Sequence, residues 1–163
     1  MNYPTVKHVQ EVTDFKKESY AKGAIETLMW LEDGAPHKFD GLEGSFKFNM
    51  GEFITTSLNT CGTTCCIAGA IYAYSKRLNG NDHPLFGACQ MDGIFEIDGL
   101  SDYSKPLYRL FYADGSGIEM EYITPQEAAI TLRKYLETGE VDWSHVGQKK
   151  QDYDEYGEYD FDD

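Results

Sequence analysis

The sequence predicts a mainly α-helical protein: one compact domain of three to five helices, at most a small β-hairpin, and an acidic C-terminal tail. Three observations support this fold class. Apolar residues recur at three- and four-residue spacings in several segments, as on the buried face of a helix. Glycines follow these segments where helices commonly end. The 163 residues, 41% of them hydrophobic, suffice to bury a core without disulfide bonds.

We divide the chain into three parts. In residues 1–15, valines lie scattered among polar residues. This pattern predicts an N-terminal arm, either extended or containing one short strand. Residues 16–146 predict the globular helical domain. Residues 147–163 predict an acidic, aromatic tail, because like charges without aliphatic residues cannot bury enough surface to fold alone.

The first clear helical pattern runs from about Lys16 to Asp33. Asp14 or Ser19 is its expected N-cap, and Gly34 is its expected end. Its apolar face consists of Ala21, Ala24, Ile25, Leu28 and Leu31.

The next two segments are also expected to be helical. Residues 48–54 predict a short helical turn that brings Phe48, Met50 and Phe53 to the core. A central helix follows the cysteine-rich segment, with Thr63 or Thr64 as its N-cap. Its apolar face is Ile67, Ala70, Ile71, Tyr74 and Leu78, its expected end is Gly80, and its small residues Ala68, Gly69, Ala70 and Ala73 would let another helix approach closely.

The C-terminal half contains the clearest start signal. Residues 82–122 are rich in glycine and predict only a short helix at 104–111 and a turn or hairpin at 112–120. Thr124-Pro-Gln-Glu127 is a capping box with proline at the first helical position. The helix that it starts is expected to run to about Glu137, to end at Gly139, and to bury Ala128, Ala129, Leu132 and Leu136.

The charge of the chain excludes some classes of partner. The chain has 28 acidic and 14 basic residues, which gives a formal charge of −14, and residues 151–163 supply −7 of it. Such a chain does not suit direct binding to nucleic acid or to an anionic membrane, since both require clustered Lys and Arg. No signal peptide or long apolar run is present, so we expect a cytoplasmic protein.

Four cysteines, Cys61, Cys65, Cys66 and Cys89, leave three interpretations open. Cys61, Cys65 and Cys89 with His83 would make four metal ligands, although only one ligand pair has a short spacing. Cys61 before a helix N-terminus would be an activated nucleophile, with a base among His8, His37, His83 and His145. Small apolar packing residues are the favoured interpretation, so we expect no metal, cofactor or catalytic residue.

Five short motifs resemble a family of small, uncharacterised bacteriophage and prophage proteins. They are Phe48-Asn-Met50, Cys61-Gly-Thr-x-x-Cys-Ile-Ala-Gly69, Leu107-x-x-Leu-Phe111, Ile123-Thr-Pro-x-x-Ala128 and Thr138-Gly-Glu-Val-Asp-Trp143. The resemblance covers roughly residues 46–143, and the cysteine motif is its most specific part. The chain departs from the family in Ala70, where tryptophan is frequent, in the additional cysteine of the Cys65-Cys66 pair, and in the acidic tail. The resemblance implies a viral origin and assigns no activity.

These observations predict a phage accessory protein, not an enzyme, that inhibits a host nucleic-acid-handling protein by imitating nucleic acid in the host cytoplasm. The target would be a CRISPR effector, restriction enzyme, nuclease or polymerase with a basic groove. Two alternatives stay open: a cysteine-based enzyme or metal-binding protein using Cys61, Cys65 and Cys89, and a structural or scaffolding phage protein whose tail only solvates it. The expected partner-binding residues are Asp152, Tyr153, Asp154, Glu155, Tyr156, Glu158, Tyr159, Asp160, Phe161, Asp162 and Asp163.

Overall fold

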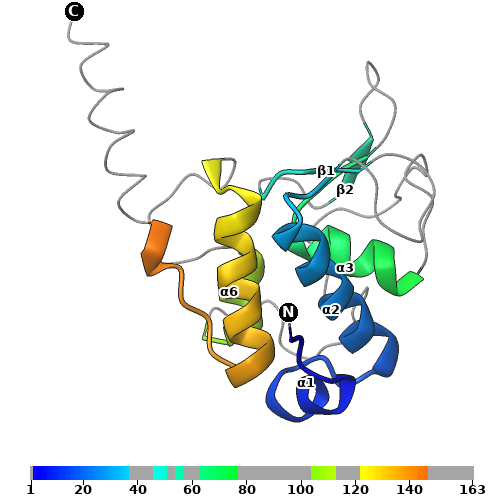
Figure 1. Ribbon diagram of the computed structural model, residues 1–163, viewed down its shortest axis with the longest axis vertical. Helices are drawn as coiled ribbons and strands as arrows, with labels where there is room; N and C mark the ends of the chain where they lie inside the picture. The colour runs from blue at the N-terminus through cyan, green and yellow to red at the C-terminus, as the bar shows by residue number, and fades with distance from the viewer. Residues whose placement is uncertain are drawn as a thin grey trace, which may run out of the picture.

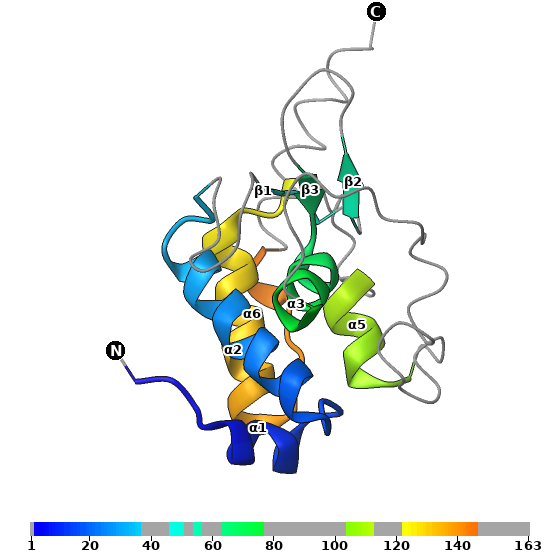
Figure 2. The same ribbon diagram turned by 90° about the vertical axis from the view of Figure 1, so that its right-hand side faces the viewer.

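The computed structural model describes residues 2–36, 46–50, 54–56, 63–76, 104–112 and 122–146, and the structural statements below concern these ranges. Within them the protein is mainly α-helical, as predicted (Figures 1 and 2). The elements are α1 (Val6–Val12), α2 (Glu18–Glu32), β1 (Phe46–Phe48), β2 (Ile54–Thr56), β3 (Thr63–Cys65), α3 (Ile67–Lys76), α5 (Pro106–Tyr112), α6 (Pro125–Thr138) and the 3₁₀ helix η3 (Ser144–Val146).

Helix α2 organises the core. It packs against both α3 and α6, while α1 packs across α2 and α6. The strands lie at one end of the helices and α1 at the other (Figures 1 and 2). The largest fully buried side chains come from nearly every described helix and are Tyr20, Tyr135, Phe15, Phe111, Leu28, Leu31, Met50, Ile67 and Ile71.

The bounds of α2 follow the prediction, but its start does not. Lys17 is the N-cap, without a capping hydrogen bond from its side chain, so neither Asp14 nor Ser19 caps the helix. Ser19 already lies inside the first turn, where its side chain cannot occupy the N-cap position. At the other end Gly34 has a φ of 91°, and its N–H donates to the carbonyl of Leu31 at 3.0 Å. The predicted glycine terminus is therefore confirmed.

Helices α2 and α3 approach closely through small residues. Ala68, Gly69, Ala70 and Ala73 of α3 are all buried, as the sequence predicts. Across the seam, a Cβ atom on Gly23 would lie 2.5 Å from Ser75 Oγ and 2.9 Å from the Ile71 carbonyl oxygen. The residue at this point of α2 must therefore lack a side chain.

A small mixed sheet replaces the helical turn expected around Phe48. The strand order is β1-β3-β2, with β1 parallel and β2 antiparallel to β3. The helical prediction for residues 48–54 is wrong, because β1 pairs with a strand distant in sequence, which local periodicity does not register. Phe48 and Met50 nevertheless reach the core as predicted, while Phe53 lies outside the described residues.

The same sheet corrects the start of the central helix. Thr63 and Thr64 belong to strand β3, where they pair with residues of β1 and β2, so neither is an N-cap. Helix α3 begins only at Ile67. Ile67, Ala70, Ile71 and Tyr74 are buried, as expected of its apolar face. Leu78 and Gly80 lie outside the described residues, as does nearly all of the turn or hairpin expected at 112–120.

Residues 6–12 of the expected N-terminal arm form the helix α1, so the expectation of an extended chain or a strand is wrong there. Thr5 caps α1 by accepting a hydrogen bond from the His8 N–H at 3.1 Å. Val9 and Phe15 are fully buried, and the Phe15 ring meets the edge of the Tyr135 ring with centroids 6.0 Å apart. Burial against α2 and α6 stabilises a helix that is too short to be stable by propensity alone.

Helices α5 and α6 match their predictions. The capping box of α6 is complete: the Glu127 N–H donates to Thr124 Oγ1 at 3.1 Å, and the Thr124 N–H donates to Glu127 Oε1 at 2.8 Å. Gly139 ends the helix with a φ of 82°, directly against the Val12 carbonyl oxygen. The four predicted core residues of α6 are buried: Ala128, Ala129, Leu132 and Leu136.

Candidate functional site

The predicted partner-binding residues all lie outside the described part of the chain. They belong to residues 147–163, and their role stays a prediction that rests on the sequence. They are Asp152, Tyr153, Asp154, Glu155, Tyr156, Glu158, Tyr159, Asp160, Phe161, Asp162 and Asp163.

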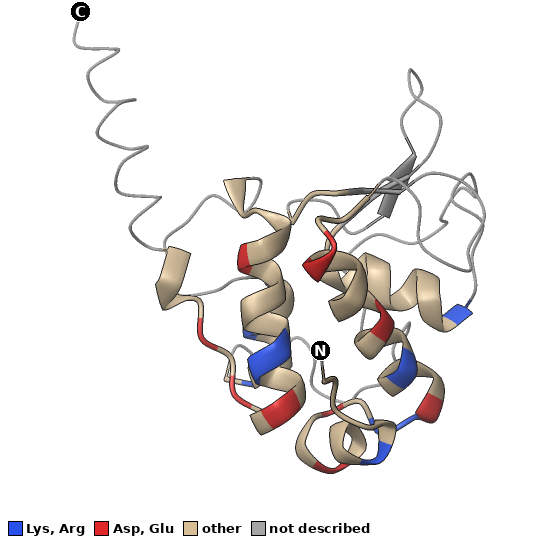
Figure 3. Ribbon diagram, viewed as in Figure 1, with Lys and Arg blue, Asp and Glu red and all other residues tan. Residues whose placement is uncertain are grey.

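The described part of the chain is electrically balanced. Its ranges contain ten acidic and ten basic residues, and side chains of both signs are interspersed over the helices (Figure 3). The remaining residues hold 18 acidic and 4 basic side chains, so they carry the whole formal charge of −14. The acidity of the chain therefore lies both in residues 151–163, which carry −7, and in residues 1–150, which carry −7.

The structure places only part of the cysteine motif. Cys65 is the last residue of β3, and Cys66, between β3 and α3, is a buried thiol. Burial of Cys66 agrees with the favoured interpretation of these cysteines as packing residues. Cys61, Cys89 and His83 lie outside the described residues, so the metal and nucleophile interpretations stay predictions. Within the described ranges, no three His, Cys, Asp or Glu side chains gather to hold a metal ion.

Two of the four histidines are described, and both bond to backbone carbonyl groups. His8 Nε2 lies 2.8 Å from the carbonyl oxygen of Glu137. His145 Nε2 lies 3.0 Å from the carbonyl oxygen of Glu127. These contacts give the two rings structural roles at either end of α6. His37 is outside the described residues, like His83.

A shallow groove runs along the exposed face of α6 beside the end of α2. Its volume is about 480 Å³, and its floor is aliphatic, formed by Ala129 and Ile130. Ile130 is 58% exposed and is the most exposed large hydrophobic residue in the described ranges. The other lining residues are polar or charged: Glu32, Gln126, Arg133, Lys134 and Glu137.

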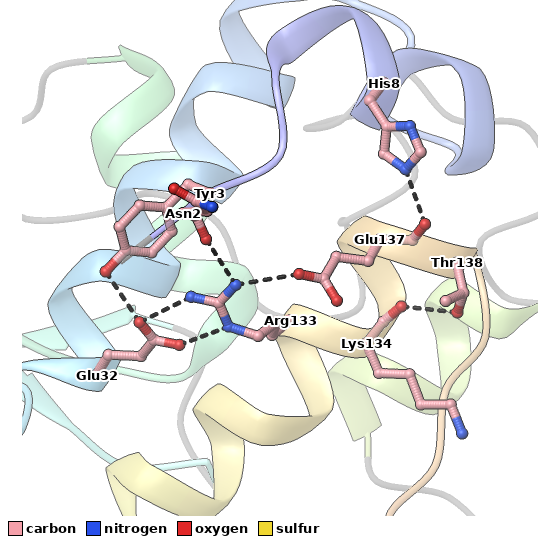
Figure 4. A network of polar contacts seen from close by, with 8 residues as sticks. All are labelled: Asn2, Tyr3, His8, Glu32, Arg133, Lys134, Glu137 and Thr138. Atoms are coloured by element: carbon pink, nitrogen blue, oxygen red, sulfur yellow. Dashed lines mark hydrogen bonds and ion pairs between the residues drawn. The ribbon is translucent and has the colours of Figure 1, made fainter.

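Arg133 is the centre of a polar network on the wall of this groove (Figure 4). Its guanidinium donates to both carboxylate oxygens of Glu32, at 2.8 and 3.0 Å. It also donates to the Asn2 carbonyl oxygen at 2.9 Å and to Glu137 Oε2 at 3.0 Å. The Tyr3 hydroxyl donates to Glu32 Oε1 at 2.9 Å, and the Tyr3 ring lies 5.0 Å from the guanidinium carbon. One side chain therefore ties together α2, α6 and the N-terminal segment.

The network shifts the protonation equilibria of its members. Hydrogen bonds from Arg133 hold the pKa of Glu32 below its ordinary value, although partial burial acts in the opposite direction. The hydrogen bonds to Glu32 raise the pKa of Arg133. Partial burial and the bond to Glu32 raise the pKa of Tyr3. The ion pair is therefore charged at neutral pH, with the phenol protonated beside it.

Sequence reasoning missed the groove and the network. The spacing of Arg133 and Glu137 is the four-residue spacing of a helical ion pair, which is a weak local signal. The partners that matter more, Glu32 and Tyr3, are over a hundred residues away along the chain. Only the packing of α1 and α2 against α6 brings them to Arg133.

Comparison of the chain with protein-family models, with curated proteins and with solved structures finds no match. Among the helices that the structure describes, none is both long enough and apolar enough to cross a membrane.

Proposed function

We propose that the protein is a phage accessory protein that inhibits a host nucleic-acid-handling enzyme by presenting carboxylates in place of phosphates. The observation that carries the proposal is the acidity of the chain. Its formal charge is −14, of which residues 151–163 carry −7 and residues 1–150 the other −7. Such a charge attracts a basic partner.

The acidic tail has the chemistry that a basic groove binds. Residues 151–163 contain seven carboxylates interspersed with four aromatic residues, and no basic side chain. Carboxylates pair with Arg and Lys, while aromatic rings stack on guanidinium groups. Complementary charge also accelerates association, which favours an inhibitor that competes with nucleic acid for the same groove.

The resemblance of the cysteine and helix motifs to phage and prophage proteins supports a viral origin, and hence action in the host cytoplasm. A CRISPR effector, a restriction enzyme, a nuclease and a polymerase all present the basic groove that the proposal requires.

The test is capture of host proteins from a lysate by the intact chain and by two tail variants. One variant lacks residues 151–163, and the other keeps the length and the aromatic residues but carries amides in place of the seven carboxylates. Both variants are expected to lose the captured nucleic-acid-binding protein, and excess DNA or RNA should displace it from the intact chain.

The salt dependence separates charge from stacking. The screening length falls from about 10 Å at 0.1 M salt to about 3 Å at 1 M, so carboxylate-driven binding weakens with salt. Changing Asp152, Asp154, Glu155 and Glu158 to amides should lower affinity and flatten this dependence. Changing Tyr153, Tyr156 and Tyr159 to Ala should lower affinity with little change in slope. Unaltered inhibition after tail deletion, with nucleic acid still bound by the target, would disprove the mimicry.

A further inference from the structure

Asn2 and Tyr3 lie at the junction of α2 and α6 and are held there by side chains from both helices (Figure 4). Arg133 holds the segment twice, through the Asn2 carbonyl oxygen at 2.9 Å and the Tyr3 ring at 5.0 Å. Glu32 holds it once more by accepting the Tyr3 hydroxyl at 2.9 Å. All of these contacts are made by Arg133 or by Glu32.

The same residues form a wall of the α6 groove. Glu32, Arg133 and Glu137 line the groove beside Ala129 and Ile130. Arg133 binds Glu137 and Glu32 with the same guanidinium that holds Asn2. The N-terminal residues and the wall of the groove therefore share one guanidinium group.

The fastening of residues 2–4 is local. Asn2 is exposed, Tyr3 is half-buried against the edge of the core, and Glu32 and Arg133 have side chains that are 20% and 22% exposed. The chain from Thr5 onward is anchored differently, because Thr5 caps α1 and Val9 and Phe15 are fully buried. Opening of residues 2–4 breaks a few polar contacts and the partial packing of the Tyr3 ring but leaves α1 in place, which makes it a local transition.

We propose that residues 2–4 are a latch on the α2–α6 junction, with Arg133 as its catch, and that the closed latch restrains the wall of the groove. Release of Asn2 and Tyr3 removes one partner from Glu32 and two from Arg133, so the Arg133 side chain becomes freer to move away from Ala129 and Ile130. The apolar floor of the groove then becomes more accessible. This inference is independent of the proposed function, since it involves no residue of the tail.

Backbone dynamics test the latch directly. The ¹⁵N order parameters of Asn2 and Tyr3 in the wild-type chain should be near the rigid value of about 0.85, and Tyr3→Ala should reduce those of residues 2 and 3 below about 0.6. Arg133→Met should have the same effect on both residues. Lys134→Met is the matched control, because Lys134 is the neighbouring cation on α6 and reaches only Glu140 at 4.0 Å and Asp142 at 3.5 Å among the described ion pairs.

Two latch variants are used so that the test remains informative if one of them does not fold. Tyr3→Ala changes neither α2 nor α6, so it remains informative if Arg133→Met unfolds the chain. Unchanged order parameters in Tyr3→Ala, or flexible residues 2 and 3 in the wild type, would overturn the proposal. An equal loss of order in Lys134→Met would overturn the assignment of Arg133 as the catch.

Access to the groove is measured with the apolar dye anilinonaphthalene sulfonate. Tyr3→Ala should increase dye fluorescence over that of the wild type, and adding Ile130→Ser to this variant should abolish the gain. No gain in Tyr3→Ala, or a gain that survives Ile130→Ser, would show that the latch does not control this groove.

Discussion

Helix α2 meets its two neighbours in different ways. Against α3 it forms an apolar seam of small residues, where Gly23 lies so close to Ile71 and Ser75 that no side chain fits. Against α6 it forms an apolar seam whose outer edge is closed by the Arg133–Glu32 ion pair. The stability of the first seam depends on the side-chain volume at Gly23. The stability of the second depends, at its edge, on the directional hydrogen bonds between Arg133 and Glu32. They should therefore respond to different substitutions and to different solution conditions.

The largest effect is expected at the α2–α3 seam. Gly23→Ala would add a Cβ atom 2.9 Å from the backbone oxygen of Ile71, so the helices must separate. Overpacking of this kind costs about 1–3 kcal/mol of unfolding free energy. At an exposed helical position the same substitution would stabilise by about 1 kcal/mol, so the sign alone is decisive. Chemical denaturation measures it, with Lys22→Ala, at an exposed position of α2, as the control. A stabilised Gly23→Ala variant would mean that the seam is looser than described.

The second effect is expected at the edge of the α2–α6 seam. Arg133→Met removes both hydrogen bonds to Glu32, and the remaining carboxylate keeps only Tyr3 among the partners in Figure 4. We expect a loss of about 1.5 kcal/mol, the low end for hydrogen bonds to charged groups, because the pair is partly exposed. Lys134→Met should change stability very little, since exposed ion pairs contribute little. Equal losses in the two variants would show that the network adds nothing beyond a surface charge.

A smaller effect is expected at the start of α6, outside both seams. Thr124→Ala removes the side-chain oxygen that accepts from the Glu127 N–H. Loss of an N-cap of this kind costs about 1 kcal/mol. Thermal or chemical denaturation measures the loss, and Thr124→Ser, which keeps the hydroxyl, should recover most of it. A cost that Thr124→Ser shares would assign the effect to packing of the methyl group and not to the cap.

The smallest expected effect is a difference between the two seams in how their contribution to stability depends on pH. Because the pKa of Glu32 is lowered in the folded protein, the Arg133–Glu32 pair stabilises fully above the unfolded value of about 4.3. This contribution is lost as pH falls through the lowered folded value. Glu137 and Tyr3 are the other titratable groups bonded within the network. Gly23, Ile71 and Ser75 at the other seam carry no charge in this range.

Denaturation of the wild type and of Glu32→Gln between neutral and acidic pH measures this difference. The gap in stability between them should narrow as the pH falls below the unfolded pKa of a glutamate. Gly23→Ala should instead run parallel to the wild type over the same range. A constant gap for Glu32→Gln would show that the carboxylate charge does not stabilise the seam.

Predictions from the sequence were correct where the signal was local. The capping box at Thr124, the glycine ends at Gly34 and Gly139, and the apolar faces of α2 and α6 all involve residues within a few positions of one another. Local hydrogen bonds and helical periodicity are properties of a short segment, so they could be read without knowing the fold.

Predictions failed where a distant partner decided the outcome. Phe48 and Thr63 are strand residues because β3 pairs with β1 on one side and with β2 on the other. Val6–Val12 is a helix because α2 and α6 bury its one apolar side, which an isolated stretch of scattered valines does not indicate. Lys17 in place of Asp14 or Ser19 at the N-cap of α2 shows the same limit, since the chain path into the helix is set by the packing of Phe15.

The sequence by itself determined the mainly helical class, the ends of α6 and the acidic excess of the chain, because composition and short-range hydrogen bonding suffice for each. The tertiary structure alone decided which helices meet and that Arg133 joins Glu32, Tyr3 and Asn2 on the wall of one groove. These depend on contacts between residues far apart in the chain, whose geometry is fixed only when the apolar faces of α1, α2 and α6 pack together.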